Sequence, residues 1–303
     1  MAKIYVLVFL VMVSWGFNVS ATKILVDEFS PVTMTAYRIF TAGVAAFVIL
    51  YFLKLVRLPT KQELPAVLIG AILNVTGHHF FLAVGLKHTT GINGGIILGF
   101  GPLLTVLLSV MLLGFRLTLF RCLGFIIGFA GVLLTVLHGN AELEGVSMGD
   151  VGVLLSITSQ ALSFIVIKKA SSTMDPRLLT GYMLVIGSFG LMALGTVIEP
   201  DGVETLARGS AAAYAIFLAA AVISTAAGHI TYNYAIGKIG AAEASIFLNL
   251  IPFFSLAGAA LFLHEEIQPS HLAGLVLIIT GVSIGSGAYK HFFRRSRNRE
   301  VSS

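Results

Sequence analysis

Long apolar runs limit what this sequence can fold into. A transmembrane helix needs about 20 mostly apolar residues, and ten runs in the chain are close to that length. They cover residues 3–25, 32–54, 65–86, 91–114, 119–138, 149–169, 178–198, 211–235, 241–263 and 271–290. The segments between them are rich in charged and turn-forming residues. The pattern predicts an all-α membrane protein with ten transmembrane helices.

The composition agrees with a location in a bilayer. Only 11% of the residues are charged and 57% are hydrophobic, whereas a soluble domain has roughly 25% charged residues. The net charge is +5, but the basic residues form short clusters beside apolar runs, which is typical of cytoplasmic membrane loops. We therefore expect no nucleic-acid partner. The single cysteine, Cys122, excludes an internal disulfide.

The second half of the chain repeats the first. Residues 85–136 align with residues 235–286 at an offset of 150 without a gap, and earlier positions align at an offset of 145. Matched prolines and glycines indicate a tandem duplication more strongly than matched leucines do. We predict a first five-helix repeat over 1–138, a second over 149–290, and a basic cytoplasmic tail over 291–303.

The positive charges predict the orientation of the helices. If both termini are cytoplasmic, fifteen Lys and Arg residues lie inside and three lie outside, namely Lys23, Lys87 and Arg208. Five helices is an odd number, so the second repeat enters the membrane from the opposite face. Inverted repeats favour secondary transport by alternating access, with a shared site near the midplane. The sequence has no G-x-x-x-x-G-K-[ST] loop for ATP.

Several short motifs occur in the same order in both halves. They are Ser14-Trp15-Gly16, Ser30-Pro31, Tyr37-Arg38, the 85–91 turn, Pro102 and Gly124/Gly131, followed by the 235–240 turn, Pro252, Glu265-Glu266 and Gly274/Gly281. On these residues the chain resembles the EamA type of the drug/metabolite transporter superfamily over about residues 3–290. The resemblance implies a bacterial inner-membrane carrier that exports amino acids, other small metabolites or toxic compounds. The family often has a Glu after helices four and nine; Glu265-Glu266 fits, but Gly114-Phe115-Arg116 stands in the first half.

Arg38 lies inside the second apolar run, where a charged side chain costs on the order of 2–3 kcal/mol. One interpretation is contact with an anionic group of a substrate, such as a carboxylate. The alternative is structural: the side chain snorkels, caps helix ends, or pairs with Asp27 or Glu28.

Other polar residues mark the third and eighth runs. Asn74, His78 and His79 lie on the third, and His229 and Tyr232 on the eighth; His79 and His229 are repeat mates. We predict that they line a central cavity. Interhelical hydrogen bonding is the alternative, and proton coupling through the imidazoles is a further hypothesis. A metal site is not expected, because no carboxylate or Cys stands at ligand spacing.

Trp15, Asn18, Gln160 and Asn249 fall near the middle of their runs. An aromatic wall with a few amides suits a small amphiphilic metabolite, although Trp15 also fits plain core packing. Pro102 and Pro252 are expected in mid-helix, where proline produces a kink. Paired kinks are compatible with a role in gating, or with one that only shapes the two helices.

The sequence thus predicts a substrate-binding protein with no catalytic residue and no cofactor. The expected activity is secondary transport of small polar metabolites such as amino acids, with export as the direction. The alternatives are multidrug efflux, a channel or non-transporting membrane protein, and an intramembrane enzyme. The expected partners are a small-molecule substrate and the lipid bilayer, with the protein as a monomer or homodimer.

Overall fold

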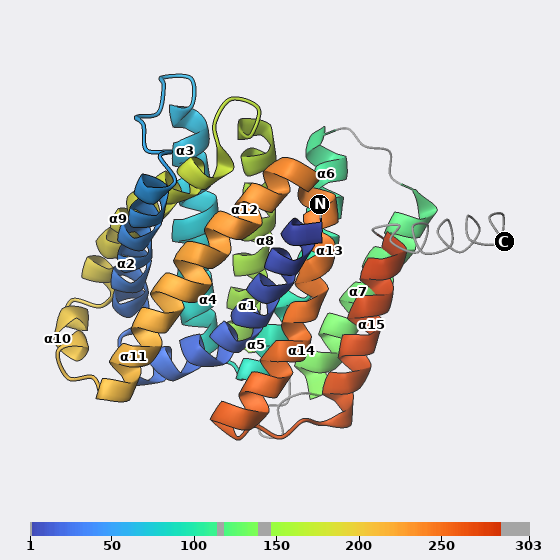
Figure 1. Cartoon of the computed structure of the whole chain (residues 1–303). Helices are drawn as coiled ribbons and strands as arrows, with labels where there is room; N and C mark the ends of the chain where they lie inside the picture. The colour runs from blue at the N-terminus through green and yellow to red at the C-terminus, as the bar shows by residue number, and fades with distance from the viewer. Residues whose placement is uncertain (1, 114–117, 139–146, 286–303) are drawn as a thin grey trace.

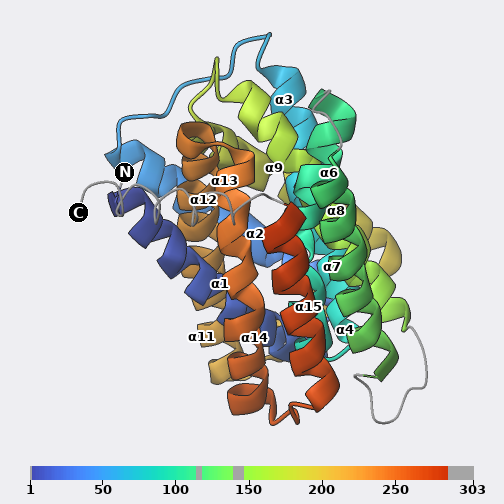
Figure 2. The ribbon, with the colours of Figure 1, turned by 90° about the vertical axis from the view of Figure 1, so that its right-hand side faces the viewer.

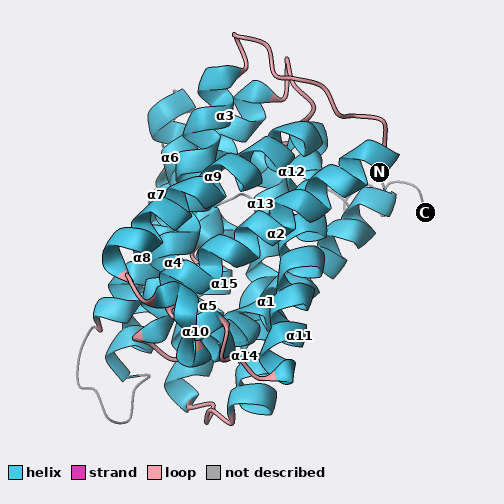
Figure 3. Cartoon of the chain, turned by 90° about the vertical axis from the view of Figure 1, so that its left-hand side faces the viewer, coloured by secondary structure: helices cyan, strands magenta, loops and turns pink. Residues whose placement is uncertain are grey.

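The computed structural model of the chain describes residues 2–113, 118–138 and 147–285. Within these ranges every regular element is a helix, and no strand is present (Figure 3). Seven helices are long and apolar enough to cross a membrane, and three shorter apolar helices accompany them. The prediction of an all-α protein is therefore confirmed. The predicted tail over 291–303 lies outside the described residues.

The first half contains five helical stretches. They are α1 (Ala2–Glu28), α2 (Pro31–Phe52), a continuous stretch of α3 (Leu64–Gly70), the π-helix η1 (Ala71–Gly77) and α4 (His78–Lys87), then α5 (Gly91–Leu98) with α6 (Gly101–Leu113), and α7 (Leu119–His138). The loop before α3 contains Pro59 and Thr60, and the loop before α5 contains Thr89 and Thr90, in agreement with the turn pattern.

The second half follows the same order. It comprises α8 (Met148–Ala170), α9 (Pro176–Ile198), the short α10 (Gly202–Leu206), a stretch of α11 (Ala211–Ala219), the π-helix η2 (Ala220–Ala227) and α12 (Gly228–Ile239), then α13 (Ala241–Ile246), the 3₁₀ turn η3 (Phe247–Leu250), α14 (Ile251–Gly258) and the π-helix η4 (Ala259–Leu263), and finally α15 (Pro269–Gly285). The π-helices η1 and η2 occupy corresponding positions of the two halves.

The two halves pack through equivalent helices. α7 packs along α15, and α2 packs along α9, so each of these helices meets its repeat mate; the two pairs stand at opposite sides of the molecule (Figure 1). α1 lies beside α14, as Figure 2 shows. Glycines allow the closest approach: a Cβ on Gly281 would lie 2.6 Å from the Gly124 carbonyl oxygen, and one on Gly43 would lie 2.8 Å from Val185. Small residues of this kind let membrane helices come together.

Pro102 and Pro252 lie within the apolar stretches Gly91–Leu112 and Phe247–Leu263, but at interruptions of the helix and not inside a continuous one; their role in gating stays a prediction. Each is the second residue of a new helix, α6 or α14, directly after an interruption. Gly99 and Phe100 break the first stretch, and η3 breaks the second. Because proline has no backbone N–H to donate, the first turn of a helix is the position that tolerates it.

Acidic side chains cap helices at the end of the molecule opposite the N-terminus. Glu265 accepts hydrogen bonds from the backbone N–H groups of Gly91 and Ile92 at 2.7 and 2.8 Å. Glu199 does the same for the first turn of α2, at 3.0 Å from Val32 N and 2.8 Å from Thr33 N. The first N–H groups of a helix have no partner within it and favour negative charge. Glu265 therefore has a structural role in joining the two halves.

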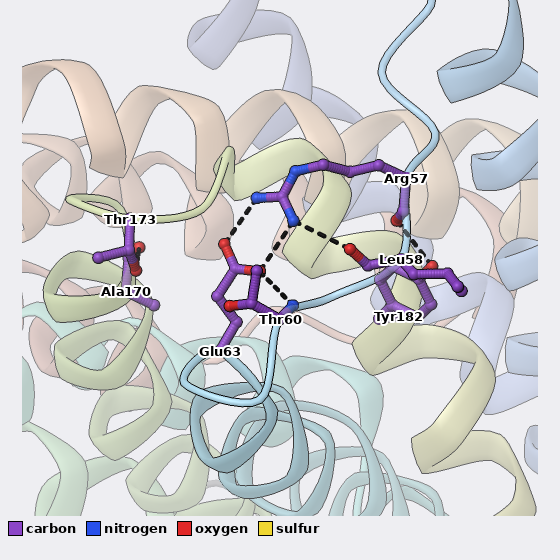
Figure 4. Close-up of polar contacts among 7 residues, drawn as sticks. All are labelled: Arg57, Leu58, Thr60, Glu63, Ala170, Thr173 and Tyr182. Carbon is purple, nitrogen blue, oxygen red and sulfur yellow. Dashed lines mark hydrogen bonds and ion pairs between the residues drawn. The ribbon is translucent and has the colours of Figure 1, made fainter.

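The loop from residue 53 to residue 63 is held by one ion pair (Figure 4). Arg57 binds both carboxylate oxygens of Glu63, at 2.8 and 2.6 Å, and Glu63 also accepts from the backbone N–H of Thr60 at 2.7 Å. These donors lower the pKa of Glu63 to about 2. Tyr182 of α9 donates its hydroxyl to the Arg57 carbonyl at 2.9 Å, which ties the loop to the second half.

Candidate functional site

A cavity of about 50 Å³ lies between helices of both halves. Its walls come from α1, α4, α5, α8, η2, α12, η3 and α14. The lining residues are Trp15, Asn18, Val19, Thr22, His78, His79, Leu82, Leu98, Ile157, Gln160, Ser224, Thr225, His229, Leu248 and Ile251. Side chains that can form hydrogen bonds, among them three histidines, are thus gathered around one cavity in the helical interior.

The π-helix η2 positions α1 at the cavity. Trp15 Nε1 donates to the carbonyl oxygen of Ser224 at 2.8 Å, and the hydroxyls of Ser14 and Ser224 lie 2.7 Å apart. A Cβ on Gly228 would lie 2.7 Å from Trp15 Nε1, so the glycine leaves room for the indole. π-turns within α-helices occur frequently at functional sites, and this one fixes the only tryptophan of the chain.

The π-helix η1 makes the corresponding contacts with α8. Ser159 Oγ donates to the Leu73 carbonyl oxygen at 2.8 Å, and Asn74 Nδ2 donates to Ser163 Oγ at 2.7 Å. Ser159 is the repeat mate of Ser14. The first helix of each half is therefore hydrogen-bonded to the π-helix of the other half.

Three imidazole rings meet at the cavity. The His79 ring lies 4.7 Å from the His78 ring and 5.7 Å from the His229 ring, between centroids. His78 is held by Ser156 Oγ at 2.7 Å from Nδ1 and by Gln160 Nε2 at 3.1 Å from Nε2. Both ring nitrogens of His79 lack a hydrogen-bond partner among the described residues. Both nitrogens are buried, so a molecule in the cavity reaches them only after neighbouring side chains move.

An aromatic wall closes one side of the site. The Trp15 ring lies 4.9 Å from His229 and 5.0 Å from Tyr232, and Tyr232 lies 5.4 Å from Phe164. Tyr232 is fully buried. It packs behind the indole, as a support for the wall.

The structure brings together six of the predicted substrate-binding residues. Those that line the cavity are Trp15, Asn18, His78, His79, Gln160 and His229. Four others lie behind the lining or away from it: Arg38, Asn74, Tyr232 and Asn249. Asn74 supports α8 as described, and Asn249 is a half-buried residue of η3.

Arg38 is buried but does not pair with Asp27 or Glu28, which corrects that interpretation. Asp27 instead pairs with Lys23 at 3.3 Å and with Lys87 at 3.7 Å. Glu28 accepts from the backbone N–H of Ser210 at 2.6 Å. Arg38 Nη1 donates to Thr225 Oγ1, a cavity-lining group, at 3.1 Å.

Sequence reasoning missed Thr22, Ser224 and Thr225. These residues line a cavity that only the tertiary contacts create. A signal was present, because the offset of 150 pairs Ser224 with Asn74, and Ser224 and Thr225 interrupt an apolar run.

A second pocket, of about 340 Å³, lies between α1 and the α11–η2 stretch. Most of its lining is apolar, including Phe17, Ile216, Ile223 and Phe262. It shares Asn18 and Ser224 with the cavity described above, which we call the polar cavity.

Among the residues that the structure describes, no group of three or more His, Cys, Asp or Glu lies together in a way that could hold a metal ion.

Comparison with known proteins places these features in a family. The model of the EamA-like transporter family matches the chain twice, over residues 2–137 and 147–286. The chain belongs to this family. The resemblance drawn from the sequence motifs is thus confirmed.

Relatives of this EamA-like transporter extend over nearly its whole length. An uncharacterized transporter, YyaM, of Bacillus subtilis is 27% identical and aligns over 95% of each chain. A protein of Streptantibioticus cattleyicolor, named "Probable terminal-alkyne amino-acid exporter", is 23% identical over 91% of this chain and 90% of its own. A solved crystal structure with 15% sequence identity superposes with a TM-score of 0.71, covering 96% of this chain and 99% of that one. It shares the fold.

The polar cavity of this EamA-like transporter is small in the observed conformation. Ligand pockets usually measure about 300–1,000 Å³, whereas about 50 Å³ holds only a few water molecules. A metabolite therefore needs the surrounding helices to separate before it can enter.

Proposed function

We propose that the protein is a secondary transporter that exports small polar metabolites, such as amino acids, across the bacterial inner membrane by alternating access. The observation that carries the proposal is the cavity between helices of the two halves, whose lining includes Trp15, His79, Gln160 and His229. Membership of the EamA-like transporter family supports transport. The name of the relative from Streptantibioticus cattleyicolor supports amino-acid export as the direction and substrate.

Inverted five-helix repeats are part of the proposal. Their support is the crosswise arrangement in which α1 contacts η2 and α8 contacts η1, together with the two matches of the family model. Support for ten spans comes from the seven long helices and the three shorter apolar ones. Two similar halves in opposite orientation have inward-open and outward-open states of similar energy.

The proposed orientation places both termini in the cytoplasm. The N-terminus and the loop with Lys54, Arg57 and Lys61 lie at one end of the molecule (Figure 1). The capping acids Glu199 and Glu265 belong to the loops at the other end. This asymmetry supports the positive-inside arrangement. The expected partners are the substrate and the bilayer, with the protein acting as a monomer or homodimer.

Counterflow in proteoliposomes tests the function. Vesicles preloaded with unlabelled amino acids, purines, sugars or cationic dyes receive a trace of label outside, and a carrier accumulates the label transiently. We expect saturable accumulation that falls in Trp15→Ala and His229→Ala. Leu272→Ala, a truncation at an exposed position of α15, is the matched control. A folded protein that accumulates none of these solutes would refute the proposal.

The apolar pocket beside α1 favours a second candidate, the efflux of lipophilic compounds. It opens next to the polar cavity and is lined mainly by apolar side chains. The same panel separates the two functions, because dyes would then show counterflow and amino acids would not. Phe262→Ala, which alters only the apolar pocket, would reduce dye counterflow selectively.

A further inference from the structure

Arg38 is a buried cation without a carboxylate partner in the part of the chain that the structure describes. Its side chain is 1% exposed, and it is the eighth residue of α2, about 10 Å along the helix from its first residue. Its one side-chain hydrogen bond to a described residue goes from Nη1 to Thr225. Its Nε has no partner among the described residues.

The acids that flank the start of α2 bind groups other than Arg38. Asp27 is bound to two lysines, Glu28 caps α11, and Glu199 caps α2. None of these carboxylates pairs with Arg38 within the described chain. A buried charge is ordinarily paired or hydrogen-bonded by groups that compensate it, so the site is incomplete as a structural ion pair.

The surroundings of Arg38 add donors and no negative charge. The residues that line the cavity with Thr225 include His78, His79 and His229 and no acid. His79 has two ring nitrogens without a described partner, and it lines the cavity. Thr225 lies between Arg38 and the cavity, because its side chain bonds the guanidinium while the residue forms part of the lining. The interior is therefore electropositive at one place.

We propose that the negative charge missing at Arg38 is supplied by a carboxylate of the transported solute. This inference rests on the proposed function and narrows its substrate class to anions and carboxylate-bearing zwitterions. A planar guanidinium binds a carboxylate through two parallel hydrogen bonds, and Thr225 is the hydroxyl that the carboxylate replaces or joins. His79 supplies a further polar contact from α4.

Arg38 is covered in the observed conformation, so binding requires opening of the cavity. Alternating access provides this motion, and the carboxylate would bind once helices around Thr225 separate. Cationic solutes are disfavoured, because they would enter a site that already contains a buried positive charge. The positive charge of Arg38 therefore selects the class of substrate.

Binding to matched solutes tests the inference. Thermal unfolding of the full-length protein in detergent is followed with L-phenylalanine, L-threonine, L-glutamate, succinate and benzoate, each beside its carboxyl-blocked amide. At least one carboxylate should raise the unfolding midpoint while its amide does not. Arg38→Gln should weaken the apparent affinity about tenfold or more, and Arg38→Lys should retain part of it, because an ammonium keeps the charge without the paired geometry. Arg208→Gln, at an arginine whose side chain is 80% exposed, is the control.

Several results would overturn the inference. One is equal binding of carboxylates and amides by the wild type, a measurement that does not depend on any variant being folded. Another is unchanged carboxylate affinity in Arg38→Gln. The inference would also be overturned if no carboxylate raised the unfolding midpoint. It would fail as well if sodium chloride raised the midpoint as much as the carboxylates do, because Arg38 would then bind a halide. Counterflow of neutral or cationic solutes alone would leave the transporter standing and refute only the substrate class.

Discussion

The imidazole rings of His79 and His229 lie 5.7 Å apart, although 150 residues separate them in the sequence. They are repeat mates, and both line the polar cavity. Equivalent residues of the two halves therefore meet at one place.

Replacing His79 with Phe should separate stability from function. Both ring nitrogens lack a described partner, so an apolar ring of similar shape removes buried polar atoms at little cost or with a small gain in stability. We expect an unchanged or higher unfolding midpoint and a loss of counterflow. His88→Phe, at an exposed residue after α4, should affect neither. A His79→Phe protein with full counterflow would show that the imidazole only packs.

Gly228→Ala should destabilise the protein through Trp15. The added methyl would lie 2.7 Å from Trp15 Nε1, and overpacking of this kind costs about 1–3 kcal/mol. In a Trp15→Phe background the clashing atom is absent, so the same substitution should cost less. Unfolding measurements on both single variants and the double variant give the coupling directly. Additive effects would show that Gly228 does not act by making room for the indole.

Gly281→Ala should weaken the packing of α15 on α7. A Cβ there would lie 2.5 Å from Gly128 N and 2.6 Å from the Gly124 carbonyl oxygen. Both are backbone atoms that cannot rotate away, so the helices must separate. We expect a loss of about 1–3 kcal/mol in the free energy of unfolding. Val276→Ala, at an exposed position of α15, should cost much less; equal losses would contradict the close contact.

Acid should abolish the contribution of Glu63 to stability. Its pKa is lowered from 4.5 to about 2 in the folded protein, so the folded state favours the ionised form. The stabilisation is complete above about pH 4.5 and is lost as the pH falls towards 2. Glu63→Gln should therefore unfold at a lower temperature than the wild type at pH 7, and the difference should shrink between pH 4.5 and pH 2.

Exposed Asp201, at the start of α10, provides the matched substitution for the acid experiment. Asp201→Asn should lower the unfolding temperature little at pH 7. A Glu63→Gln deficit that stays constant from pH 7 to pH 2 would mean that the ion pair with Arg57 does not stabilise the loop.

The sequence by itself determined the helical class, the family and several residues of the cavity. Apolar runs of spanning length leave helices as the element that satisfies every backbone group within the run, and polar residues such as His79 and Gln160 stand out in those runs because they are costly there. The fixed offset between Pro102 and Pro252 revealed the two halves without any structure.

Only the tertiary structure decided which polar residues share a cavity and which ones support it. Asn74 and His78 lie one helical turn apart, yet Asn74 bonds Ser163 outside the lining while His78 lines the cavity. No pattern within a single run indicates that η2 places the Ser224 carbonyl oxygen at Trp15, or that Arg38 bonds Thr225 and not an acid. These choices depend on how neighbouring helices pack, and long-range packing is not contained in the periodicity of any single run.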